Sequence, residues 1–423
     1  MKRYSEYKDS GVKWIGEIPG HWKSVPFRRI AKVQCNLVHP FDNLEMLQIS
    51  PDSIEKDSGK IIKIKTVAEA NIDSDNHRFY KGQILYSKIR PLLNKVTIAP
   101  EDGLCSADMY PISTEEKTEF IKYYMLSKAF LSSVKNIVAD RVKMPKINQD
   151  ELKETRFVIP PLSEQEAIVT YLDTKVAKID EYISIAEKKI AALEELKQTI
   201  IAEAVTRGIH KDVLMKDSGV KWIGMIPEHW KVMRLSQIAY EHFISNKKIH
   251  HQNLLSLSYG QIIRKDINGT NGLLPASFDT YQVVEEGNII LRLTDLQNDH
   301  KSLRVGLVKE TGIITSAYLC LAPKNMVYSK FLYFQLHACD IKKVFYSMGD
   351  GLRQSLNYDG MRKLASVIPP LPEQQEIVTY IEAKVAKIDQ LCQAERSQIE
   401  KLKEYKQRLI SDVVTGKVKV TND

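Results

Sequence analysis

Two loops of the sequence combine the side chain types that read and hold nucleic acids. Residues 140–146 read Asp-Arg-Val-Lys-Met-Pro-Lys, and residues 349–355 read Gly-Asp-Gly-Leu-Arg-Gln-Ser. Arg and Gln hydrogen-bond guanine and adenine edges in a major groove, while Lys and Ser commonly hold phosphates. The loops therefore predict DNA contacts, with plain surface turns as the alternative. The candidate residues are Arg141, Lys143, Lys146, Arg353, Gln354 and Ser355.

Catalytic chemistry would need motifs that the sequence lacks. Gly11–Gly16 and Gly219–Gly224 have the spacing of a phosphate-binding loop but continue with Glu17 and Met225, where such a loop has Lys. No HExxH metal motif occurs, and no Ser or Cys lies in a nucleophile-elbow context. We expect a chain without an active site, a metal or a cofactor of its own, and an enzyme with an unusual site is the alternative.

Composition sets the class of protein that must position these loops. The chain has 423 residues, a hydrophobic fraction of 43% and a net charge of +8, which favours packed domains and an anionic partner. Its five Cys form no CxxC pair and indicate free thiols in a reducing compartment. No run of 18 apolar residues occurs, so we expect a cytoplasmic protein without a membrane partner.

The sequence repeats itself once. KDSGVKWIGEIPGHW at 8–22 returns at 216–230 with 13 of 15 positions identical. VIPPLSEQEAIVTYLDTKVAKID at 158–180 returns at 367–389 with 17 of 23 identical. The offsets of 208 and 209 residues predict two copies of one module, in which a constant frame surrounds a divergent insert.

Each frame predicts one long helix. No Gly or Pro occurs from Ser163 to Arg207 or from Glu373 to Thr415, and Ser163 with Glu166 is typical of a capping box that starts the first helix. Apolar residues recur in alternating steps of four and three, which predicts a coiled-coil seam. Two separate helices, each packed on its own domain, are the alternative. The predicted seam residues are Leu172, Val176, Ile179, Ile183, Ile190, Leu193, Ile200, Ile381, Val385, Ile388, Ile399, Leu402 and Leu409.

The inserts carry the positive charge. Residues 23–157 have 22 Lys and Arg against 18 Asp and Glu, and residues 231–366 have 17 against 11, so the remaining chain sums to −2. Both inserts mix strand-like and helical segments. The predicted strands include 61–68, 82–89 and 288–293, and the predicted helices are 117–135 and 329–345. All four Trp lie in the repeated block, where Ile and Pro neighbours favour packing over base stacking.

The repeated motifs resemble those of the specificity subunits of type I restriction-modification systems. The KWIG…HW block and the two IPPLxEQ helix openings at 159–165 and 368–374 carry this resemblance, in the family's order of insert, helix, insert and helix. The resemblance implies an α+β fold with two mixed α/β target recognition domains, separated by a long antiparallel two-helix coiled coil with pseudo-two-fold symmetry.

The resemblance also implies a function. Each recognition domain would read one half of an asymmetric, bipartite sequence in double-stranded DNA. The helices would space the two domains and dock modification (methyltransferase) and restriction (endonuclease) subunits. The cofactors S-adenosylmethionine, ATP and Mg would bind to those partner subunits and not to this chain.

The predicted boundaries follow from the repeat. They are 1–159 for the first recognition domain, 160–208 for the first helix, 209–368 for the second recognition domain, 369–417 for the second helix and 418–423 for a tail. A tandem DNA-binding regulator that acts alone, or a coiled-coil protein scaffold without DNA binding, are the alternative functions.

Overall fold

The chain divides into two compact units that share two long helices. The computed structural model describes residues 2–267, 275, 277–296, 303–348 and 355–420. Unit 1 comprises Met1–Ala186 and Arg396–Asp423, and unit 2 comprises Glu187–Glu395. The predicted mixture of strands and helices is confirmed in both units. Helices α5 (Leu162–Arg207) and α9 (Leu371–Val414) each contribute one part to unit 1 and the other to unit 2.

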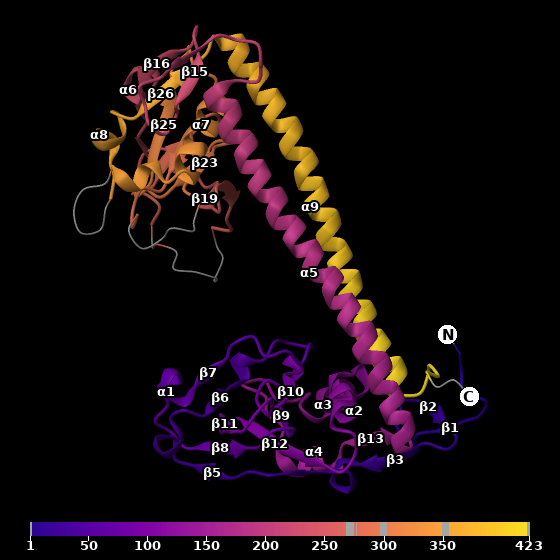
Figure 1. Cartoon of the computed structure of the whole chain (residues 1–423). Helices are drawn as coiled ribbons and strands as arrows, with labels where there is room; N and C mark the ends of the chain where they lie inside the picture. Colours follow the sequence, from indigo (N-terminus) through magenta and orange to yellow (C-terminus); the bar gives the residue numbers. More distant parts are fainter. Residues whose placement is uncertain (1, 268–274, 276, 297–302, 349–354, 421–423) are drawn as a thin grey trace. The chain divides into compact units, whose positions relative to one another are not determined.

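The insert of unit 1 holds a four-stranded sheet, a five-stranded sheet and the four short helices α1 to α4 (Figure 1). A four-stranded sheet has the order β10-β9-β12-β4, and a five-stranded sheet has the order β5-β8-β11-β6-β7. Helices α2 and α3 pack on the first sheet, where Phe130 of α3 meets Tyr86 of β9 with ring centroids 5.7 Å apart. The bounds are β4 Ala31–Val33, β5 Leu37–Val38, β6 Leu47–Ile49, β7 Lys65–Thr66, α1 Val67–Ala70, β8 Asn76–Phe79, β9 Ile84–Ser87, β10 Val96–Ile98, β11 Gly103–Cys105, β12 Met109–Thr114, α2 Thr118–Leu126, α3 Lys128–Ile137 and α4 Gln149–Glu154.

Unit 2 repeats the first sheet and varies the rest. Its four-stranded sheet has the order β17-β25-β22-β23, which matches β4-β12-β9-β10 strand for strand. A three-stranded sheet, β18-β21-β24, and a hairpin, β19-β20, replace the five-stranded sheet. The bounds are α6 Leu235–Ile238, β17 Ala239–Glu241, β18 Ile244–Ser245, β19 Leu255–Ser258, β20 Gln261–Arg264, β21 Gln282–Val284, β22 Ile289–Leu291, β23 Val305–Leu307, β24 Gly312–Ile314, β25 Leu319–Pro323, α7 Ser329–Ile341 and α8 Tyr358–Met361.

Three expectations for local structure are corrected. The segment 61–68 forms a strand only at Lys65–Thr66, since Thr66 caps α1 through the Glu69 amide. The helix expected over 117–135 divides at Ser127, whose hydroxyl caps α3 by accepting from the Phe130 amide. Helix α5 begins at Leu162, before Ser163, so the expected capping box does not start it.

The repeated Gln of the helix openings fastens each insert to its long helix. The Gln165 carbonyl oxygen accepts from the Lys117 amide at 3.0 Å, and its amide nitrogen donates to the Pro160 oxygen at 3.0 Å. Gln374 makes the same two contacts, with the Tyr328 amide and the Pro369 oxygen. Both Gln side chains are fully buried. The IPPLxEQ motif therefore fixes where the inserts end and the helices begin.

The repeated Glu of the same motif binds the tryptophan block. Glu164 accepts from the Trp22 ring nitrogen at 3.1 Å and contacts His21, and Glu373 accepts from Trp230 at 3.0 Å and contacts His229. Trp22 and Trp230 are fully buried, which confirms packing as the role of these two rings. The block comprises β1 (Tyr7–Asp9) with β2 (Glu17–Pro19), and β14 (Met215–Asp217) with β15 (Met225–Pro227).

Strands on either side of each insert close it. Strand β3 (Lys23–Pro26) pairs with β13 (Arg156–Ile159), and β16 (Lys231–Arg234) pairs with β26 (Ala365–Ile368). These pairs bring the two ends of each insert together beside the start of its long helix.

The two helix ends meet equivalent blocks by different routes. Gly208 ends α5 with a positive φ, 77°, and approaches Trp230 in the block that follows along the chain. Gly416 ends α9 with φ 74° and approaches Trp22, although no peptide bond links these segments. Hydrogen bonds make this second junction: the Lys419 amide donates to the Lys2 oxygen, and the Tyr7 hydroxyl donates to the Gly416 oxygen.

The long helices contact each other inside each unit. In unit 2, Lys189 pairs with Glu395 and Lys197 with Asp389, so the two helices run antiparallel there. In unit 1, Lys406 pairs with Asp180 at 2.7 Å. Every predicted seam residue is buried or half-buried. Within the described part of the chain, no helix is long and apolar enough to cross a membrane.

Candidate nucleic-acid interface

The first candidate loop pairs with the end of strand β9 to form one exposed edge. The Ile147 amide donates to the Lys88 oxygen at 2.9 Å, and the Arg90 amide donates to the Pro145 oxygen at 2.8 Å. An antiparallel bridge joins Ile89 to Lys146. We call residues 88–90 and 141–147 edge 1. Arg90 and Met144 both have positive φ, 44° each, in this edge. Such strained backbone often occurs at functional sites.

Arg141 holds edge 1 in shape. Its guanidinium forms a salt bridge with Glu151 and donates to the Lys146 oxygen. The hydrogen bond from Arg141 holds the pKa of Glu151 below its usual value. Glu151 is itself fixed by Asn148, whose amide it accepts and whose side chain caps α4. Arg141 is thus the residue that ties the loop to helix α4.

Besides Arg141, four cations line edge 1 and make it positive: Lys88, Arg90, Lys143 and Lys146. Arg90, Lys143 and Lys146 are exposed, and within the described residues none of them has an ion-pair partner. Lys88 lies over the Tyr110 ring at 5.4 Å. Exposed cations on a shaped backbone suit phosphate and base-edge contacts. Sequence reasoning missed Lys88 and Arg90, although Lys88 lies near the end of the predicted strand 82–89 and Arg90 directly follows it.

The second candidate loop meets the equivalent strand end of unit 2. The Leu356 amide donates to the Leu293 oxygen at 2.9 Å, as the Ile147 amide does to Lys88 in unit 1. Asp295 is the counterpart of Arg90 and also has a positive φ, 57°. We call residues 292–296 and 355–356 edge 2. Ser355 is exposed on it. Arg353 and Gln354 lie outside the described residues.

A buried cation supports edge 2. Arg304 is fully buried, and its guanidinium donates to the main-chain oxygens of Arg292, Thr294 and Asp295 at 3.1, 2.8 and 3.1 Å. Its Nε donates to the Tyr346 hydroxyl at 3.2 Å. Sequence reasoning missed this residue because nothing in the local pattern distinguishes a buried Arg from an exposed one.

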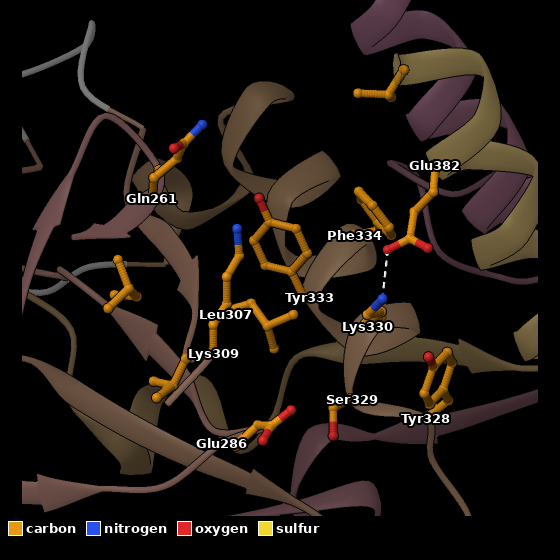
Figure 2. A pocket seen from close by; sticks show the side chains of 15 residues that line it. Gln261, Glu286, Leu307, Lys309, Tyr328, Ser329, Lys330, Tyr333, Phe334 and Glu382 are labelled. Carbon is orange, nitrogen blue, oxygen red and sulfur yellow. Dashed lines mark hydrogen bonds and ion pairs between the residues drawn. The ribbon is translucent and has the colours of Figure 1, made fainter. Parts of the chain in front are cut away.

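Unit 2 also contains a cavity of about 840 Å³ between its insert and the helices. Figure 2 shows Lys309 beside the ring of Tyr333, and Lys330 bound to Glu382 of α9 at 2.7 Å. The volume is within the range of about 300–1,000 Å³ that small ligands occupy. Across the described ranges, no cluster of three or more His, Cys, Asp or Glu side chains has the arrangement of a metal site.

The chain is similar in sequence to specificity proteins of type I restriction systems. Residues 45–195 match the family model for the type I restriction modification DNA specificity domain. The chain is 38% identical to the EcoDI specificity subunit of Escherichia coli over 45% of this chain and 43% of that subunit. It is 25% identical to a putative MjaX specificity subunit of Methanocaldococcus jannaschii over 98% of both chains.

A solved structure described as "Structural basis underlying complex assembly and conformational transition of the type I R-M system" shows the same fold. It has a TM-score of 0.69 at 15% identity and covers 95% of this chain and 99% of its own.

Proposed function

We propose that this chain is a specificity subunit of a type I restriction-modification system. In this proposal, it binds an asymmetric bipartite DNA target. Unit 1 recognises one half-site through edge 1, and unit 2 recognises the other through edge 2. The observation that carries the proposal is the equivalent position of the two edges. In each unit, a loop after the insert helices pairs with the end of the central strand, β9 or β22.

The chemistry of edge 1 supports DNA as the ligand. The exposed side chains of Arg90, Lys143 and Lys146 place positive charge on one short segment pair. Phosphate contacts of this kind supply affinity and release counterions, whereas base-edge contacts supply specificity. The two inserts differ in sheet structure, which favours two unlike half-sites over a palindrome.

The long helices act as a spacer in this proposal. They form an antiparallel coiled coil that separates the recognition domains, and they dock the modification and restriction subunits. Two recognition domains of modest affinity bind more tightly when they are joined rigidly, because the second binding event becomes intramolecular. The chain contributes recognition, while partner subunits bind S-adenosylmethionine, ATP and Mg and perform methylation and cleavage.

Sequencing of methylated adenines tests the proposal. Cells that express this chain with its methyltransferase partner should carry methylation at one bipartite motif with two unlike halves. Methylation at an unsplit motif would contradict the two-reader arrangement. Binding to the same motif by the chain alone, without any methyltransferase in pull-downs, would favour a stand-alone regulator. Failure to retain duplex DNA at low salt, with partners present, would favour a protein scaffold.

Deletion of one heptad from both long helices tests the spacer. The preferred distance between half-sites should shorten, because the separation of two rigidly joined readers sets the spacing of their sites. A control variant with one heptad deleted and reinserted one heptad further along in each helix keeps the seam register and should keep the original spacing. An unchanged spacing in the shortened variant would show that the helices are not the ruler.

A further inference from the structure

Arg304 occupies an unusual position for its charge. Its side chain is fully buried, and its guanidinium donates to three main-chain oxygens of the segment after β22. These oxygens belong to Arg292, Thr294 and Asp295. Its main-chain amide donates to the carboxylate of Asp340, a buried residue of α7, at 2.6 Å. Arg304 therefore links the loop after β22 to helix α7, since its guanidinium binds the loop and its main-chain amide binds Asp340.

Stability alone does not account for this arrangement. A buried charge costs several kcal/mol in lost hydration, and replacing buried ionic groups by apolar ones is often neutral or stabilising. A planar guanidinium, however, holds several acceptors at fixed angles, which Lys or Met cannot do. The arrangement therefore suits the specification of one loop geometry better than the addition of stability.

The geometry that Arg304 specifies is that of edge 2. Two of its acceptors, Thr294 and Asp295, follow Leu293, whose oxygen accepts the Leu356 amide. Asp295 has a positive φ of 57°, which a non-glycine residue adopts only when its surroundings enforce it. The hydrogen bonds from Arg304 to this turn provide the enforcement.

The corresponding position in unit 1 works differently. In unit 1 the Ser87 amide donates to the Lys95 oxygen, and in unit 2 the Arg292 amide donates to the Arg304 oxygen. Lys95 is therefore the counterpart of Arg304. The Lys95 ammonium points to the Pro51 oxygen at 2.7 Å and not into edge 1. Edge 1 is fixed by Arg141 instead. Each unit thus uses one Arg, from a different segment, to shape its edge.

We propose that Arg304 is a positioning residue for recognition of the second half-site, acting through the backbone of edge 2 without touching DNA. This inference rests on the proposed function. It predicts that the sequence preference at one half-site depends on a residue buried beneath it.

Competition binding with the full chain and its methyltransferase partner tests the inference. Three duplexes are compared: the cognate target, one with the first half scrambled and one with the second half scrambled. Arg304→Met should lower discrimination at the second half-site by about tenfold, a loss comparable to one good base contact. Discrimination at the first half-site and the salt dependence of binding should keep their wild-type values. Arg304→Lys should recover only part of the loss, since an ammonium reaches fewer of the three oxygens.

Two further variants keep the test decisive. Tyr346→Phe removes one hydrogen bond to Arg304 and should lower second half-site discrimination by about threefold, even where Arg304→Met does not fold. Lys95→Met is the matched control in unit 1 and should leave the second half-site unaffected. Wild-type discrimination in Arg304→Lys and Tyr346→Phe would overturn the inference. Absence of discrimination at both half-sites in the wild-type chain would instead overturn the proposed function.

Discussion

The two units attach their inserts to the same helix pair with different polar contacts. The repeated VAKID segment supplies Asp180 in unit 1 and Asp389 in unit 2, and each pairs with a Lys from the other long helix, Lys406 or Lys197. In unit 1 the insert joins this pair, because Lys60 also contacts Asp180 at 2.9 Å. In unit 2 the third member is Glu194 of the helix itself. The frame thus supplies a constant ion pair, and in unit 1 the insert adds a contact to it.

The difference extends along the helices. In unit 1 the turn at Asp57–Lys60 covers them, and the Asp57 oxygen accepts from Gln407 at 2.8 Å. In unit 2 the counterpart Gln198 contacts His337 at 2.8 Å, and the cavity lies between the β19-β20 hairpin and α9. A divergent insert can therefore be accommodated on a constant frame by a few local contacts.

The largest expected effect is on stability, in the matched pair Asp180→Ala and Asp389→Ala. Loss of Asp180 leaves the Lys406 ammonium buried without this partner, which should cost about 3–5 kcal/mol of unfolding free energy. Asp389 is 53% exposed and Lys197 keeps Glu194, so its loss should cost about 1 kcal/mol or less. Denaturant unfolding of both variants measures the difference. Equal losses would show that the insert does not alter the burial of the constant pair.

Much of this comparison was predictable from sequence, and its decisive contacts were not. The repeat, the long helices and the packed Trp22 and Trp230 followed from identity, helix-breaker spacing and apolar neighbours. Lys197 and Lys406 pair with Asp residues of the other long helix, which lie nearly 200 residues or more away in sequence. Arg304 and Lys60 act through contacts of the folded chain, which no local pattern encodes.

The second expected effect is a dependence of stability on pH that His337 of unit 2 contributes. Burial, reinforced by Lys197, lowers the pKa of His337 to about 4, so His337 is neutral in the folded protein. The unfolded chain takes up this proton near its ordinary pKa of 6.5, so stability is fully present above pH 6.5 and falls as the pH drops toward 4. The loss approaches about 3 kcal/mol for this one group.

The variant His337→Leu tests this contribution. Leu126 is the unit 1 counterpart of His337. Each lies nine residues after the residue whose amide binds the repeated Gln, Lys117 in unit 1 and Tyr328 in unit 2. The variant should weaken the fall in stability between pH 6.5 and pH 4, as measured by thermal unfolding across that range. A pH profile identical to that of the wild type would show that His337 is not the titrating group.

The third expected effect concerns base reading. Arg353→Ala and Gln354→Ala should relax the sequence preference of the second half-site only, by about tenfold each, while Arg141→Ala should relax the first only. Arg141 acts by shaping edge 1 through Glu151 and the Lys146 oxygen. Sequence selection with randomised half-sites measures both. A uniform loss of affinity across all sequences would assign these residues to phosphate contacts instead.

The smallest expected effect tests whether edge 1 also binds the DNA backbone. Lys143 and Lys146 are exposed, so each would neutralise one phosphate and release its counterions on binding. Lys143→Ala and Lys146→Ala should each lower the slope of log affinity against log salt by about 1, with the preferred sequence unchanged. Lys175→Ala is the control, since Lys175 lies over the Tyr171 ring on α5, away from edge 1 in sequence. A slope that changes equally in all three variants would reflect net charge alone and would remove the backbone role from edge 1.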